Sequence, residues 1–229
     1  MRQFLKEENL IRGLRLALVA ALATALHFAY EYLVTRREYV VEHLGATDPT
    51  SRFALDVFGA FIALFISATA GFAWARGERL VGFGSWRRVK RDLVLIVPIG
   101  AALALLMLLV LEPLLYKPLL AAKRNPFQPA FNALTEEVIC RWGIFAIASR
   151  LSRSVRVAVV VSAAFNVLVG LKFLQLHGAG LPWWQLTAII GVKFALAIGY
   201  AVFYVRKGLL STMALRVVAA LPAPVLAFV

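Results

Sequence analysis

Five long apolar stretches run through the chain, each near or above the roughly 20 residues that a helix needs to cross a bilayer. Of the 229 residues, 62% are hydrophobic and the mean hydropathy is +0.80, whereas a soluble domain is about 45–50% apolar. A water-soluble fold cannot bury that much apolar surface. The sequence therefore predicts an integral membrane protein built as one domain of packed helices.

About seven helices in an all-α, polytopic transmembrane bundle account for the order of apolar stretches and breaks. A Pro-rich connection separates the N-terminal helices (1–129) from the core helices (130–229), because proline breaks helices and forces an irregular path. The predicted helices cover about 10–34, 53–75, 93–116, 130–149, 157–176, 185–205 and 209–229.

Basic residues cluster between the apolar stretches and predict the orientation of the chain. With the N-terminus inside, fifteen of the 25 Lys and Arg residues fall on the cytoplasmic side and six on the other side. Since cytoplasmic loops are enriched in Lys and Arg, we expect a cytoplasmic N-terminus in the plasma membrane. The first apolar run is too long for a signal peptide and has no clear cleavage site, so we expect it to be retained.

The net charge of +13 would suggest a nucleic acid partner in a soluble protein. Here the basic residues lie where they can meet anionic lipid head groups, and no nucleic-acid-binding motif is present. We therefore expect membrane lipids as partners and no nucleic acid. The single Cys140 excludes an intramolecular disulfide and a Cys-based metal cluster, and no two of the three histidines have ligand spacing. We expect neither a metal nor another cofactor.

Three ionisable residues interrupt the fourth predicted helix, which reads Thr135-Glu136-Glu137-Val138-Ile139-Cys140-Arg141. A charge at membrane depth is costly and usually faces a partner or a polar cavity. Glu137 and Arg141 are four residues apart, so they share a helix face and can form an ion pair. Glu136 is rotated by about 100° and needs another partner across the bundle. One carboxylate is thus predicted to be structural and the other available.

The sequence Glu136-Glu137-x-x-x-Arg141 resembles the EExxxR signature of the CPBP family, which comprises CAAX prenyl endopeptidases and Abi-type intramembrane glutamic proteases. The stretch 162–165 is similar to the start of the second family motif, and 199–210 is similar to the stretch before the last one. The resemblance implies that Glu136 matches the catalytic glutamate, which activates a water for attack on a peptide carbonyl. It also implies that Glu137 and Arg141 support Glu136.

The histidine and asparagine positions of the family are substituted in this chain. In the register set by Phe165, the FxxxH motif places Val169 at the histidine position, and the HxxxN motif is replaced by Arg216-x-x-x-Ala220. A literal Phe173-x-x-x-His177 follows eight residues later, about 12 Å further along one continuous helix. His177 is therefore a candidate catalytic residue or an interfacial histidine. Arginine stays protonated and cannot act as a general base.

Three functions remain open on the sequence. The first is a CPBP-like pseudoprotease that binds a membrane protein or a lipidated peptide without cutting it. The second is an active intramembrane glutamic endopeptidase that uses Glu136 and His177. The third is a small transporter or an accessory subunit of a membrane complex, with Glu136, Lys193 and Arg216 lining a polar path. If Arg216 lies near Glu136, its guanidinium would occupy the carboxylate oxygens, so we predict a salt bridge from Arg216 to Glu136 or Glu137.

Overall fold

The computed structural model describes residues 6–30, 49–75, 82–106, 109, 125–177 and 182–220, without the side chains of 49–52, 128–129 and 170–177. The elements in these residues are all helical, which confirms the predicted all-α bundle. The helices are α1 (Glu7–Ala29), α3 (Pro49–Trp74), α4 (Trp86–Leu106), α5 (Gln128–Phe131), α6 (Phe145–Ser152), α7 (Val155–His177), α8 (Trp183–Lys207) and α9 (Leu209–Ala220).

One continuous helix joins α5 to α6 through two π-helical segments, Asn132–Glu136 and Val138–Ile144. We call residues 128–152 the central helix. Counted with it, the described residues form seven helices, in agreement with the sequence. Three of the described helices are long and apolar enough to cross a membrane: α1, the part of α3 from Phe53 to Trp74, and α8.

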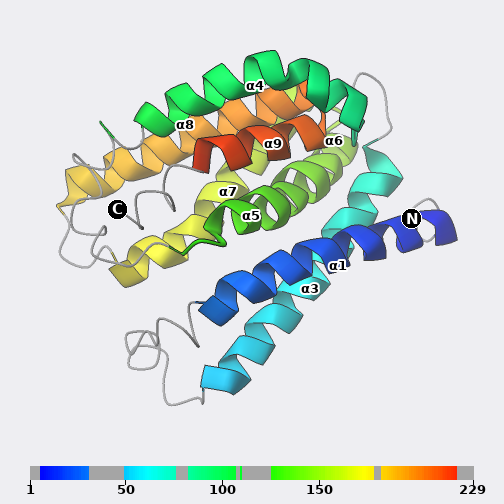
Figure 1. Cartoon of the computed structure of the whole chain (residues 1–229), viewed down its shortest axis with the longest axis horizontal. Coiled ribbons are helices and arrows are strands. Elements are labelled where there is room, and N and C mark those ends of the chain that lie inside the picture. Colours follow the sequence, from blue (N-terminus) through cyan, green and yellow to red (C-terminus); the bar gives the residue numbers. More distant parts are fainter. Residues whose placement is uncertain are drawn as a thin grey trace.

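The central helix lies between two layers of helices (Figure 1). α1 and α3 pack against each other on one side, and α4 packs against α9 on the other. α7 lies against α6 and α8, and the second π-helical segment contacts α3, α7 and α9. The core helices therefore surround the stretch that carries Glu136, Glu137 and Arg141.

Small residues allow the helices to approach closely. Ala17 and Ala20 of α1 and Ala68 and Ala70 of α3 are fully buried. Several large apolar side chains of α1 point outward, as with Leu22 at 63% exposure. Lipid tails are as apolar as leucine, so helices in a bilayer associate through small, closely packed residues and leave large ones facing lipid. The contact between α1 and α3 follows this pattern, whereas the core around the central helix also contains large buried side chains.

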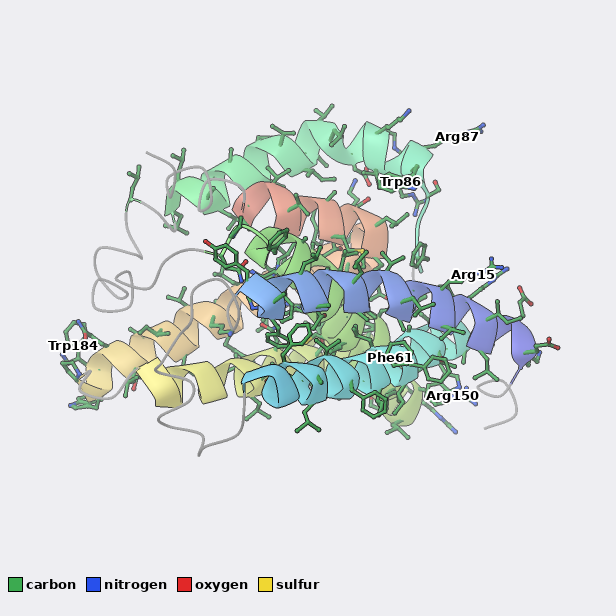
Figure 2. The ribbon with its side chains drawn as sticks, turned by 60° about the horizontal axis from the view of Figure 1, so that its bottom comes forward. Arg15, Phe61, Trp86, Arg87, Arg150 and Trp184 are labelled. Atoms are coloured by element: carbon green, nitrogen blue, oxygen red, sulfur yellow. The ribbon has the colours of Figure 1, made fainter. Side chains whose placement is uncertain are left out.

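The basic clusters lie at one end of the bundle. Figure 2 shows Arg15, Arg87 and Arg150 at the same end and Trp184 at the opposite end. Exposed tryptophans occur at both ends, with Trp86 at 70% and Trp183 at 79% exposure. Tryptophan is enriched at both membrane interfaces. The arrangement agrees with the predicted alternation of the helices and with a membrane lying between the two ends.

The start of α4 differs from its prediction. The helix begins at Trp86, seven residues before the apolar stretch that was expected to begin at 93. Ser85 precedes it, and its hydroxyl accepts a hydrogen bond from the Arg88 backbone N–H at 3.4 Å, as a helix-capping serine does. The hydrophobic pattern marks only the apolar part of α4, whereas its first turns are charged and lie outside that pattern.

Gly143 provides a test of the close packing between α3 and the central helix. A Cβ atom at this position would lie 2.6 Å from the Ser67 Cα, which is backbone and cannot give way. We expect Gly143→Ala to lower the free energy of unfolding by about 1–3 kcal/mol, the usual cost of overpacking. Gly199→Ala in α8 is the matched control, because a Cβ there meets nothing within 4 Å. Unfolding midpoints in one detergent should fall for the first variant only, and equal midpoints would contradict the packing.

Candidate functional site: a buried carboxylate–guanidinium cluster

The central helix is π-helical where its charged residues lie. Glu136 ends the first π-helical segment, Glu137 joins the two segments, and Arg141 lies within the second. π-helical turns are rare, and they occur frequently at functional sites. Sequence reasoning missed these segments, since the apolar pattern carries no signal that separates π from α geometry here.

The predicted ion pair between Glu137 and Arg141 is confirmed. The Arg141 Nη1 atom lies 3.4 Å from the Glu137 Oε1 atom, and both side chains are fully buried. The Arg141 Nη2 atom also donates to the backbone carbonyl of Ala197 in α8, at 3.4 Å. This pair therefore joins the central helix to α8 inside the bundle.

Glu136 has the cross-bundle partner that its position on the helix required. Arg216 of α9 donates a hydrogen bond through Nη2 to the Glu136 Oε2 atom, which confirms the predicted salt bridge. The Arg216 Nε atom also lies 3.4 Å from the Glu137 Oε1 atom. Both Glu136 and Arg216 are mostly buried, with 19% and 18% of their side chains exposed. One guanidinium thus contacts both neighbouring carboxylates.

We call Glu136, Glu137, Arg141 and Arg216 the carboxylate–guanidinium cluster. Its two acids and two arginines pair with one another, which offsets part of the cost of burying charge in an apolar bundle. Lys193 of α8 adds a further positive charge near Glu136 without a direct ion pair. The Arg216 guanidinium also lies 4.7 Å from the ring centroid of Tyr200 in α8. Such a cation–π contact stabilises the charged group further. The position of Arg216 is therefore set by the two carboxylates and by an aromatic face.

Several polar contacts around the cluster were not predicted. Thr135 and Thr24 share a hydrogen bond of 2.7 Å between their hydroxyls, which links the central helix to α1. On α7, Ser162 donates to the Cys140 carbonyl at 2.9 Å, and Asn166 contacts the Cys140 Sγ atom at 3.6 Å. Ser162 and Asn166 are four residues apart in an apolar helix, so they share one face. Two polar residues on one face of such a helix are the sequence signal that could have predicted these contacts.

The other predicted site positions do not join the cluster, or they lie outside the described side chains. Val169 on α7 is 53% exposed. In the register set by Phe165, the histidine position of the motif therefore lies on the outside of the bundle and away from the cluster. Ala220 is the last residue of α9 and is partly buried. His177 is the last residue of α7, which does run continuously through Phe165 and His177 as expected, but its side chain lies outside the described residues.

The chemistry available at the cluster follows from its pairing. A general base needs a carboxylate within hydrogen-bond reach of the water that it activates. Glu136 and Glu137 instead face guanidinium groups, which donate protons and do not accept them. In the described part of the chain, no group of three or more His, Cys, Asp or Glu residues could hold a metal ion. The cluster is thus built to cross-link helices α8, α9 and the central helix.

The fold and the cluster together define an all-helical membrane bundle with buried ion pairs between its core helices. The chain matches no protein-family model, no curated protein and no solved structure.

Proposed function

We propose that the chain is a CPBP/Abi-like membrane protein that has lost catalysis and binds membrane partners or substrate segments without cutting them. The observation that supports this proposal is the salt bridge from Arg216 to Glu136. Glu136 is the residue that resembles the catalytic glutamate, and Arg216 stands where that family has a histidine. A charge-assisted bond from the guanidinium engages Oε2 of the carboxylate that would have to activate water.

The residues that replace the family's other histidine and its asparagine also fit a protein without catalysis. A glutamic protease needs a carboxylate that is open to water and polar donors that stabilise the oxyanion of the tetrahedral intermediate. Val169 and Ala220 have no side-chain donor at the other two family positions. The chain keeps the glutamate half of the site and uses its carboxylates to hold arginines. Such a site lacks the donors and the open carboxylate that peptide hydrolysis requires.

A lipidated peptide is the partner that this proposal favours, and its binding can be measured. Purified protein in zwitterionic nanodiscs should bind a fluorescent farnesylated test peptide saturably and leave it intact. The unlipidated peptide should bind at least about tenfold more weakly, because apolar burial drives the association. Binding equal to that of empty nanodiscs would contradict the proposal and favour an accessory subunit that recognises a different partner.

We also propose that the basic end faces the cytoplasm of a cell whose plasma membrane the bundle spans. A reporter fused after Gly84, next to the basic start of α4, should then read cytoplasmic because of the excess of Lys and Arg around it. A reporter fused after Gly178 should read on the opposite side. Identical readings from the two fusions would mean that the number of membrane crossings between them is wrong.

A further inference from the structure

A surface pocket of about 260 Å³ lies at the start of α4, at the basic end of the bundle. It is lined by Ser85, Arg87, Arg88 and Arg91. The three arginines are spaced by one, three and four residues, so they gather on one side of the first turns of the helix. Figure 2 shows Arg87 pointing outward beside Trp86. The pocket therefore concentrates three permanent positive charges beside an exposed aromatic ring.

The positive charge of the pocket is largely uncompensated. Within the described residues, Arg87 and Arg88 make no ion pair. Arg91 has only a 4.0 Å contact from Nε to the Oδ1 atom of Asp92. Asp92 is itself buried and already engaged.

The bonds that engage Asp92 come from α8 and α9. The Lys207 Nζ atom lies 3.1 Å from Asp92 Oδ1, and Ser211 donates to Asp92 Oδ2 at 3.1 Å. Among the described residues, Asp92 is the carboxylate next to the pocket, and these bonds direct it into the bundle and away from the arginines. A ligand with an anionic, multiply accepting group such as a phosphate would supply the missing counter-charge.

The surface next to the pocket is apolar and exposed. Val94 and Leu95 follow Arg91 by three and four residues, so they continue the same helix face. Their side chains are 80% and 45% exposed. At 1.5 Å per residue, the step from the guanidinium-bearing turn to this apolar surface is about 5 Å. A ligand that fits both parts carries a phosphate at one end and hydrocarbon at the other.

We propose that this pocket binds the phosphate-bearing head group of an anionic phospholipid, whose acyl chains lie along Val94 and Leu95. Phosphate recognition alone would also suit a free phosphate ion. The exposed apolar face directly below the arginines favours the lipid, as does the place of the pocket at the basic end beside Trp86. The site is separate from the carboxylate–guanidinium cluster and does not depend on the function proposed for that cluster.

Native mass spectrometry of the purified full chain with added phosphatidylglycerol tests this site. The pocket variant carries Arg87→Gln, Arg88→Gln and Arg91→Gln. The matched control carries Arg150→Gln, Arg153→Gln and Arg156→Gln, which remove the same charge from exposed positions at the same end. We expect the affinity for phosphatidylglycerol to fall by at least about tenfold in the pocket variant and by less than about twofold in the control.

Two results would overturn the proposal. An equal loss of affinity in both triple variants would mean that the lipid responds only to the overall charge of this end. Displacement of the lipid by inorganic phosphate at about the same concentration as phosphatidylglycerol itself would mean that the pocket takes a soluble anion. If the pocket variant does not fold, the single Arg87→Gln variant replaces it, with Arg150→Gln as its control and the same requirement that only the first weakens binding.

Discussion

Replacing Arg141 with alanine should destabilise the folded protein by about 3 kcal/mol. Breaking a buried ion pair costs roughly 3–5 kcal/mol, because it leaves the remaining charge without a partner in an apolar setting. Glu137 would become that charge, since its side chain is fully buried. The 3.4 Å contact from Arg216 Nε to Glu137 Oε1 survives, and for this reason we expect the lower part of the range. Equilibrium unfolding in detergent measures the difference.

Arg150 provides the control for this prediction. It lies in the same central helix and is exposed at the basic end, so Arg150→Ala should change the free energy of unfolding by less than about 0.5 kcal/mol. The double variant Glu137→Gln/Arg141→Met should recover much of the stability, because removing both charges leaves no unpaired ion. Equal destabilisation by Arg141→Ala and Arg150→Ala would show that the buried pair makes no special contribution.

Arg216→Ala should be at least as damaging, and Glu136→Gln should be milder. Without Arg216, Glu136 loses its hydrogen-bonded partner, and only Arg141 remains in salt-bridge contact with either carboxylate. Lys193 of α8 is then the positive charge left to Glu136, and it makes no direct ion pair with it, so the carboxylate is poorly compensated within the bundle. Glu136→Gln removes one charge-assisted hydrogen bond, about 1.5–3 kcal/mol, and leaves Arg216 in contact with Glu137.

A double-mutant cycle makes this second prediction specific. The Glu136→Gln/Arg216→Ala variant should show a coupling free energy of about 1–3 kcal/mol, as interacting residues do. The control cycle combines Glu136→Gln with Arg206→Ala in α8 and should show a coupling free energy near zero. Arg206 is exposed and makes no ion pair within the described residues. Coupling near zero would mean that Arg216 and Glu136 do not interact in the folded protein.

The sequence predicted the helices and the ion pairs for different reasons. The apolar stretches determined the number and order of the helices, because each must span about the same thickness of hydrocarbon. The Glu137–Arg141 pair followed from the four-residue spacing on a helix. The Arg216–Glu136 contact joins residues 80 positions apart, and only the resemblance to a family motif placed them together.

The features that the sequence did not predict are those on which the local pattern of apolar and polar residues carries no information. The π-helical segments of the central helix have no hydrophobic period of their own that differs from an α-helix over so few residues. The Thr24–Thr135 hydrogen bond depends on how α1 crosses the central helix. The stacking of Arg216 on Tyr200 likewise depends on the packing of α8 against α9. Each of these contacts is set by tertiary packing rather than by residue spacing.

The most direct test of the proposed function is a cleavage assay with the Glu136→Gln variant as its internal control. Purified protein in nanodiscs is incubated with farnesylated and transmembrane-helical test peptides, and the products are identified by mass spectrometry. We expect no cleavage product that distinguishes the native protein from Glu136→Gln, because Arg216 engages an oxygen of the carboxylate that would activate water and the family's histidine and asparagine are absent from their positions. Peptide cleavage by the native protein that disappears in Glu136→Gln would contradict this account and identify the chain as an active intramembrane protease.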